Sequence, residues 1–272
     1  MPLPVCRVGR TAWYVNDFVD GDRAIPEETA IAFSYGGTTH AVMMASPQDL
    51  EDFAFGFSLA ERIVSSPNEI THLEIVEQEI GIELRLWLAE PHASNFSERR
   101  RHMAGPTGCG LCGLESLAEV MRPPARVSSG LVFSPREIMR AIASVSPAQA
   151  LNRETRAVHA AAFWEPSCGL VALREDVGRH NALDKLAGAL ARDGISARSG
   201  IIVLTSRVSI EMVQKAASIG APVIVAISAP TAVAVRTAEA AGITLVGIAR
   251  GDGFEIFTHP DRITREQVAH VA

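Results

Sequence analysis

Ile201-Ile202-Val203-Leu204 and Val223-Ile224-Val225-Ala226-Ile227 are the stretches that decide the fold, together with a third apolar run at residues 243–248. Short, uninterrupted apolar runs are typical of parallel strands that are buried on both faces. The two segments between them, residues 209–219 and 231–241, have helical spacing, and each is followed by a glycine, which commonly ends a helix. This alternation of strands and helices predicts the α/β fold class.

The loops that follow these strands are the first candidate for a binding site, because open α/β sheets bind ligands at the carboxyl ends of their strands. We expect residues 205–209, 228–231 and 249–253 to meet there. They supply hydroxyl groups, the guanidinium groups of Arg207 and Arg250, and the free N–H groups of two helix N-termini, which together suit a phosphate. Helix capping alone also accounts for the hydroxyl groups, so both interpretations stay open.

The N-terminal part of the chain is rich in strand-forming residues. Apolar runs on either side of Gly36-Gly37 predict a hairpin. Ser46-Pro47 predicts the N-cap and first residue of a helix that continues to about Val64. Residues 70–79 and 80–88 predict two further strands, the second with alternating apolar and polar side chains.

The run Arg122-Pro123-Pro124-Ala125-Arg126 interrupts helical spacing and predicts a boundary. We therefore expect a β-rich N-terminal region at residues 1–125, which ends in a cysteine-containing loop and a helix, and an α/β cofactor-binding domain at residues 126–272. The chain as a whole is then of the α+β kind.

Two thiols, Cys109 and Cys112, lie in the stretch Gly108-Cys109-Gly110-Leu111-Cys112-Gly113. Residues 114–121 have apolar side chains at helical spacing, which places both thiols at or just before a helix N-terminus. The unpaired N–H groups and the helix dipole favour a thiolate there, and the thiolate is the nucleophilic form. Two cysteines at this spacing form a reactive dithiol or half of a metal site, and the residues alone leave both open.

Composition and charge exclude several classes of function. The chain has 272 residues and a formal net charge of −6, which argues against a surface that coats nucleic acid. Residues 1–7 do not resemble a signal peptide, and no apolar stretch reaches the roughly 18 residues of a membrane span, so we expect a cytoplasmic protein. The remaining cysteines, Cys6 and Cys168, are too few for a disulfide framework, and we expect Cys168 to be a small packing residue.

Residues 174–186 are the second dense polar stretch. On a helix from about Val177, the side chains of Asp176, His180 and Asp184 fall on one stripe at four-residue spacing. The stripe is either a solvated, charged helix face or a histidine that is oriented by a carboxylate to carry a proton or contact a ligand.

Several of these stretches together resemble the FdhD family, the sulfurtransferases that are needed to make active formate dehydrogenase. The longest match is residues 174–186, and it accompanies the match around Cys109 and Cys112. The full set runs in family order along the chain and comprises residues 107–113, 159–162, 174–186, 211–217, 228–231 and 245–250.

The resemblance implies a sulfurtransferase that receives sulfur from a cysteine desulfurase as a persulfide on Cys109, with Cys112 as the second catalytic thiol. It implies that the acceptor is the bis-guanine-dinucleotide form of the molybdenum cofactor, which serves formate dehydrogenase. It also implies a homodimer and a cytidine-deaminase-like, three-layer C-terminal core. The family's cofactor-binding stretch falls on Ile248, Ala249, Arg250, Gly251, Asp252 and Gly253.

Two other functions are compatible with the thiol pair. One is a dithiol oxidoreductase, in which Cys109 and Cys112 alternate between thiols and a disulfide. The other is a zinc-binding protein of deaminase-like fold, because zinc deaminases combine His-x-Glu with Pro-Cys-x-x-Cys. Here Ala160-Ala161 follows His159 and Gly108 precedes Cys109, so we expect no catalytic metal.

Overall fold

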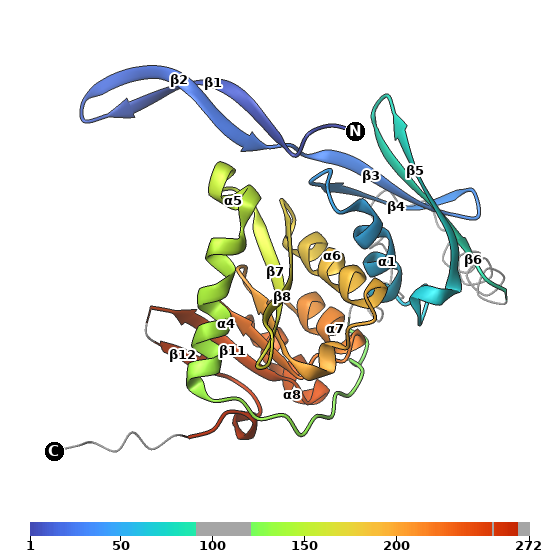
Figure 1. Ribbon diagram of the computed structural model, residues 1–272, viewed down its shortest axis with the longest axis vertical. Helices are drawn as coiled ribbons and strands as arrows, with labels where there is room; N and C mark the ends of the chain where they lie inside the picture. The colour runs from blue at the N-terminus through green and yellow to red at the C-terminus, as the bar shows by residue number, and fades with distance from the viewer. Residues whose placement is uncertain (91–120, 252, 266–272) are drawn as a thin grey trace.

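The computed structural model of the chain describes residues 1–90, 121–251 and 253–265 (Figure 1). The described chain forms a mixed α/β structure with three separate sheets of two, four and six strands. No helix within these ranges is long and apolar enough to cross a membrane. Cys109 and Cys112 lie outside the described residues.

The largest sheet has the strand order β12-β11-β10-β9-β7-β8. Its bounds are β7 His159–Glu165, β8 Gly169–Asp176, β9 Ile201–Leu204, β10 Val223–Ala226, β11 Thr244–Arg250 and β12 Gly253–Ile256. Strands β9, β10 and β11 are parallel, which confirms the expectation from the three apolar runs. The flanking strands β12, β7 and β8 are antiparallel to their neighbours, so the sheet is mixed.

Helices cover both faces of this sheet and make three layers (Figure 1). The helix α4, Pro135–Ala148, packs on one face against Ile201 and Val203, and its N-terminus has a capping box of Ser134 and Glu137. On the other face Ile202 and Leu204 pack among the remaining helices. These are α6 Arg179–Arg192, α7 Ile210–Ser218 and α8 Ala232–Ala241.

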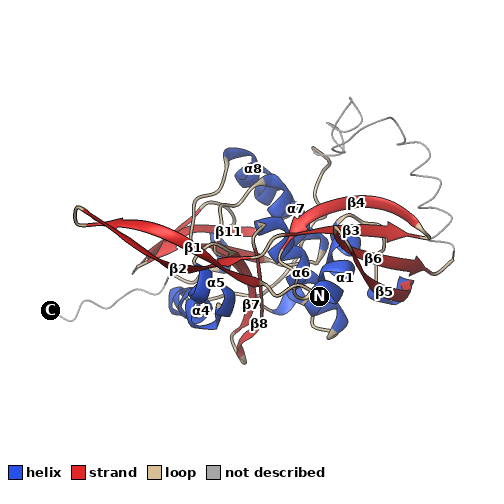
Figure 2. Cartoon of the chain, turned by 90° about the horizontal axis from the view of Figure 1, so that it is seen from above, coloured by secondary structure: helices blue, strands red, loops and turns tan. Residues whose placement is uncertain are grey.

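A four-stranded sheet with the order β4-β3-β6-β5 forms the other core (Figure 2). Its strands are β3 Thr29–Tyr35, β4 Thr38–Ala45, β5 Ile70–Gln78 and β6 Gly81–Leu88, and the expected hairpin at Gly36 and Gly37 joins β3 to β4. Phe33 of β3 stacks on Phe57 of helix α1, Leu50–Ala60, with ring centroids 4.1 Å apart. Short helices complete the described part of the chain: α5 Ala150–Thr155 and the 3₁₀ turns Pro67–Glu69, Ala197–Ser199 and Pro260–Arg262.

The start of α1 differs from the prediction. Ser46 is not the N-cap, because the helix begins at Leu50 after Asp49, whose φ of 54° lies in the left-handed region. Ser46 is fully buried, and its backbone N–H donates to the carboxylate of Asp176 at 3.0 Å. A long-range polar contact has therefore replaced the local capping contact that the sequence favours.

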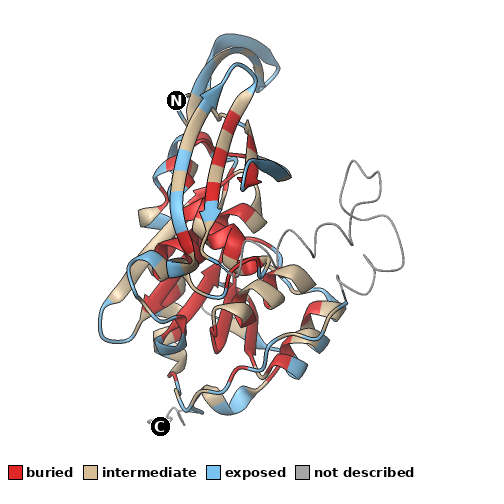
Figure 3. Cartoon of the chain, turned by 90° about the vertical axis from the view of Figure 1, so that its right-hand side faces the viewer, coloured by how far each residue is buried: buried red, intermediate tan, exposed pale blue. Residues whose placement is uncertain are grey.

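The first two strands, β1 Val5–Tyr14 and β2 Asp17–Pro26, form a two-stranded arm that extends from the body (Figure 1). Burial is concentrated in the sheets and helices of the body (Figure 3). Trp13 and Val15, by contrast, are 60% and 92% exposed at the tip of the arm. These apolar side chains near the N-terminus therefore belong to an exposed arm and not to a core.

Candidate functional site

The loops after β9, β10 and β11 lie side by side at the carboxyl edge of the parallel strands. The backbone N–H of Thr231 donates to the carbonyl of Val208 at 2.9 Å, and that of Ile248 donates to the carbonyl of Ser228 at 3.2 Å. The edge also receives the start of β7, because the amide of Ala160 donates to the hydroxyl of Thr205 at 2.8 Å. We call this region the carboxyl edge.

The predicted cofactor-binding stretch, residues 248–253, covers the end of β11 and the first residue of β12 at this edge. Arg250 ends β11 and is exposed, and it pairs in register with Gly253. Gly251 has a φ of 66°, a conformation that suits glycine. Asp252 lies outside the described residues.

The first two residues of this stretch differ from the others in accessibility. The side chain of Ala249 is fully buried in the core between the sheet and α4. Ile248 is half-buried, has a φ of 54°, and already uses its N–H in the bond to Ser228. Among the described residues of this stretch, Arg250, Gly251 and Gly253 are therefore the exposed ones.

The two helix N-termini at the edge are capped differently, which separates the two interpretations left open by the sequence. The Thr231 hydroxyl accepts a hydrogen bond from Ala234 N at 3.2 Å, so helix capping accounts for this residue. Ser209 makes no side-chain cap, and its hydroxyl lies 3.4 Å from Nε2 of His180. Ser209 therefore does not cap α7, whereas the carboxylate of Glu211 in the first turn accepts from its own backbone N–H.

His180 and Arg179 occupy the first turn of α6 beside Ser209. Burial lowers the pKa of His180 to about 4, and the charge of Arg179 acts in the same direction. The pKa of His159, at the start of β7, is also lowered, mainly by burial and secondly by the charge of Arg179. Both imidazoles are therefore neutral at pH 7, and each offers one donor and one acceptor.

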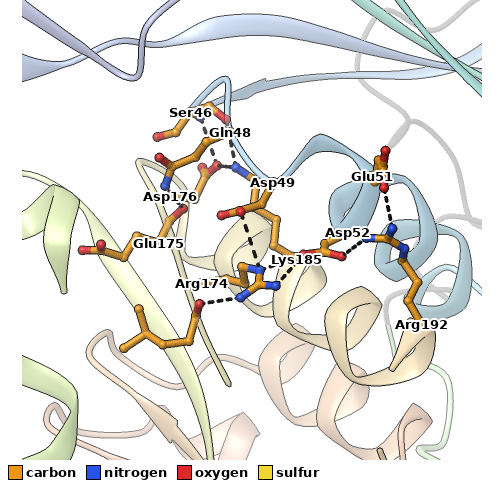
Figure 4. A network of polar contacts seen from close by, with 11 residues as sticks. Ser46, Gln48, Asp49, Glu51, Asp52, Arg174, Glu175, Asp176, Lys185 and Arg192 are labelled. Carbon is orange, nitrogen blue, oxygen red and sulfur yellow. Dashed lines mark hydrogen bonds and ion pairs between the residues drawn. The ribbon is translucent and has the colours of Figure 1, made fainter. Parts of the chain in front are cut away.

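A buried ion pair holds α6 in place behind these residues (Figure 4). Nζ of Lys185 donates to Asp176 at 2.6 Å and to the backbone carbonyl of Ser46 at 2.8 Å. The other carboxylate oxygen of Asp176 accepts from Gly178 N at 2.7 Å and Asn181 Nδ2 at 2.9 Å. Asp176 and Lys185 are both fully buried, and every charged atom has a partner, as a buried pair requires.

Two arginines extend this network to α1 (Figure 4). Arg174 donates through Nε to Asp52 at 2.7 Å, and Arg192 donates to the other oxygen of Asp52 at 2.5 Å. Arg192 also pairs with Glu51. The network thus joins β8, α6 and α1 and fixes where the first turn of α6 lies.

The predicted stripe of Asp176, His180 and Asp184 is wrong as a helix face. Asp176 is the last residue of β8, and Asp184 is fully buried and accepts two bonds of 2.7 Å from Lys215. Burial raises the pKa of Asp184 to about 6. Burial disfavours the charged form of Lys215, but the nearby carboxylates of Asp184 and Glu61 outweigh burial and raise the pKa of Lys215 above its ordinary value.

Neither lysine was predicted to form a buried ion pair, although the sequence carries one signal. Lys185 and Lys215 are the only two lysines in the chain, whereas Lys and Arg together number 25. Such scarcity fits lysines that serve in internal ion pairs. The partner residues leave no local pattern, because Ser46 and Asp176 meet Lys185 only through the fold.

Cys6 and Cys168 are both exposed and unpaired. The expectation that Cys168 is a packing residue is therefore wrong. Cys168 lies in the turn between β7 and β8, and its side chain is exposed. Both thiols are available as internal controls for chemistry at Cys109.

Comparisons with known proteins agree over nearly the whole chain. Residues 26–264 match the FdhD/NarQ family. The chain is 56% identical over 258 residues to the sulfur carrier protein FdhD of Agrobacterium fabrum, covering 94% of this chain and 95% of that protein. It is 54% identical over 257 residues to the sulfur carrier protein FdhD of Brucella abortus, covering 94% and 96%.

A solved structure shares the fold. The crystal structure of a protein from Desulfotalea psychrophila, described as a formate dehydrogenase accessory protein, superposes with a TM-score of 0.78 at 23% identity. The match covers 96% of this chain and 100% of that chain. With a family match over most of its length and relatives more than 50% identical, the chain belongs to the FdhD/NarQ family.

Proposed function

We propose that this protein is a sulfur carrier that supports formate dehydrogenase. The observation that carries the proposal is its 56% identity, across 94% of the chain, to a protein named as a sulfur carrier. The glycine-flanked thiols Cys109 and Cys112 supply the chemistry that such a role needs.

The transfer that we propose is a thiol exchange. The thiolate of Cys109 attacks the terminal sulfur of a persulfide on a cysteine desulfurase. A sulfur–sulfur bond forms on Cys109, the one on the desulfurase breaks, and the desulfurase cysteine leaves as a thiolate. The protein then acts as a sulfurtransferase: the Cys112 thiolate attacks the inner sulfur of the Cys109 persulfide, a Cys109–Cys112 disulfide forms, and the terminal sulfur leaves as sulfide for the acceptor. A dithiol reductant then restores both thiols.

The acceptor in this proposal is the bis-guanine-dinucleotide molybdenum cofactor, held at the carboxyl edge. Exposed Arg250 and the glycines beside it are groups that suit phosphates. A homodimer and a cytidine-deaminase-like type for the three-layer core belong to the same proposal, and both come from the family resemblance.

A strain that carries Cys109→Ser tests the role in the organism. We expect formate dehydrogenase to be present at its normal level but inactive, because the protein acts on the cofactor and not on the folding of the enzyme. Immunoblotting and formate oxidation measure the two quantities. Cys168→Ser is the matched control and should leave activity unchanged. Loss of the formate dehydrogenase polypeptide would indicate a chaperone instead.

Calorimetric titration with GDP tests the cofactor site. Arg250→Ala should weaken GDP binding by about 1.5–3 kcal/mol, the scale of a charge-assisted hydrogen bond. Arg236→Ala, an exposed arginine of α8, is the control. Cys109→Ser should leave GDP affinity nearly unchanged. Normal binding by Arg250→Ala together with lost binding by Cys109→Ser would move the nucleotide to the thiol loop.

A further inference from the structure

A cavity of about 650 Å³ lies where helices α1, α6 and α7 end. We call it the helix-end cavity. It is lined by the ends of the three helices, by residues that follow them and by residues 123–125, and its apolar members include Leu59, Val64, Leu190, Ile195 and Ile219. A volume of this size can hold a small molecule or a large side chain of another protein.

The polar groups of the lining favour an apolar occupant. Ser218 Oγ donates to a backbone carbonyl of α7 at 2.8 Å, and Ser196 Oγ accepts from the N–H of Arg198 at 3.4 Å. Among the described residues, the buried side-chain atoms without a partner belong to Gln149 and Arg179, and neither residue lines this cavity. A site for a small polar molecule needs polar groups that converge on it. The helix-end cavity therefore suits an apolar side chain better.

The helix-end cavity also adjoins both points at which the segment with the two thiols joins the described chain. Before that segment, the N–H of Ala89 donates at 2.8 Å to the last residue of the 3₁₀ turn Pro67–Glu69, and Pro67 lines the cavity. After that segment, a glutamine of α7 donates to the carbonyl of Arg122 at 3.1 Å, and the next residue, Pro123, lines the cavity. A protein bound at the cavity therefore lies beside both connections of the thiol-bearing segment.

The carboxyl edge lies at the other end of the same helices. The first turn of α6 places Arg179 and His180 beside Ser209, whereas the cavity takes Leu190 and Ala191 from the last turn. Helix α6 has 14 residues and is therefore about 21 Å long. A protein bound at the cavity leaves the carboxyl edge accessible to the cofactor.

We propose that the helix-end cavity is the docking site of the sulfur donor, the desulfurase of the proposed transfer, and that it receives an apolar side chain of that protein. The donor has to reach Cys109, and the cavity adjoins both connections of the segment that contains Cys109. A few side chains that fill pockets carry most of the binding energy of a protein interface. The inference rests on the proposed function, to which it adds the surface that recognises the donor.

Filling the cavity tests this inference. Ala191→Trp places a large side chain there from the half-buried end of α6. At low desulfurase concentration, the rate at which Cys109 gains sulfur should fall at least about fivefold, as expected when an anchoring side chain is excluded. The rate at saturating desulfurase should stay at the wild-type value, because the reacting sulfur atoms are unchanged. Pro123→Asp, which puts a charge on an exposed lining residue, should act in the same direction.

Two controls separate docking from chemistry. Ala143→Trp makes the same substitution at an exposed residue of α4, which lines a different cavity on the other face of the six-stranded sheet, and it should gain sulfur like the wild type. Cysteine persulfide is a donor that needs no docking. The Cys109 thiolate attacks its terminal sulfur, a sulfur–sulfur bond forms on Cys109, and cysteine leaves as a thiolate. Ala191→Trp should gain sulfur from this donor at the wild-type rate, which shows that its thiols and fold are intact.

Mass spectrometry of quenched samples measures both rates, and the outcomes are distinct. Equal rates for Ala191→Trp and the wild type with the desulfurase would overturn the inference, and so would an equal slowing with both donors. A loss of dimer in Ala191→Trp, measured by analytical ultracentrifugation, would assign the cavity to a contact between two copies and would also overturn it. If the wild type gains sulfur from cysteine persulfide but not from the desulfurase, the proposed function fails, and the inference fails with it.

Discussion

Lys185 is the residue on which the geometry of the carboxyl edge depends most directly. It is fully buried, and its ammonium group bonds both Asp176 at the end of β8 and the carbonyl of Ser46 before α1. Burial lowers its pKa, and the charge of Asp176 opposes that shift. An ammonium group in such surroundings is tolerated only while its partner carboxylate is present.

Lys185→Met should destabilise the protein by about 3–5 kcal/mol, because it leaves the carboxylate of Asp176 buried without a counter-ion. Urea denaturation measures this loss. The matched control is the double variant Asp176→Asn/Lys185→Met, which removes both charges and should recover part of the stability. If Lys185→Met lowered the free energy of unfolding by less than about 1 kcal/mol, the neutral hydrogen-bond donors around Asp176 would be enough to stabilise its buried carboxylate.

The sequence could not predict these pairs at the level of single residues. Four-residue spacing put Asp176 and Asp184 on one stripe of a helix, but the first ends a strand and the second faces Lys215 inside the protein. Spacing records only positions along one helix. The burial of Asp184 is decided by α1 and α7, which pack against α6 from distant parts of the chain.

At the scale of elements, the contact between α1 and α6 is closer than side chains normally allow. A Cβ on Gly56 would lie 1.7 Å from the carbonyl oxygen of Asp184, and a Cβ on Gly188 would lie 1.9 Å from that of Asp52. The two glycines therefore let the helix backbones touch. This approach brings Asp52 within reach of Arg192 and so helps to set the position of α6.

Gly188→Ala should force the two helices apart and destabilise the protein by about 1–3 kcal/mol or more. Gly21→Ala in the arm is the control, because a Cβ there has no atom within 4 Å. Thermal and urea unfolding of both variants measure the difference. Equal stability of the two variants would contradict the close helix contact.

The sequence predicted well those elements that are buried on both faces, because burial gives them an uninterrupted run of apolar residues. Strands β9, β10 and β11 are uninterrupted apolar runs, and helices α7 and α8 end next to glycines at Gly220 and Gly242. Strand β2 gave no signal, because it is polar and mostly exposed and is held by pairing with β1. The start of α1 was wrong because Ser46 contacts a residue 130 positions away.

At the scale of the whole molecule, the stretches of the family resemblance that the structure describes converge on one edge. Residues 159–162 begin β7, residues 174–186 end β8 and begin α6, and residues 211–217 form α7. The sequence predicted the three loops of this edge from strand order alone. It did not predict that His159 and Arg179 join them, because the start of β7 and the end of β8 reach this edge only through the antiparallel pairing of β7 with β8 and β9, which no local pattern encodes. The boundary at residue 125 stays a prediction.

The central claim is that sulfur travels on Cys109, and mass spectrometry tests it most directly. The protein is incubated anaerobically with a cysteine desulfurase and cysteine, digested, and examined for persulfide on each of its four cysteines. We expect one added sulfur atom on Cys109, none on the exposed controls Cys6 and Cys168, and none on the loop in Cys109→Ser. Sulfur that still accumulates at Cys112 in Cys109→Ser, but not at Cys109 in Cys112→Ser, would contradict the account.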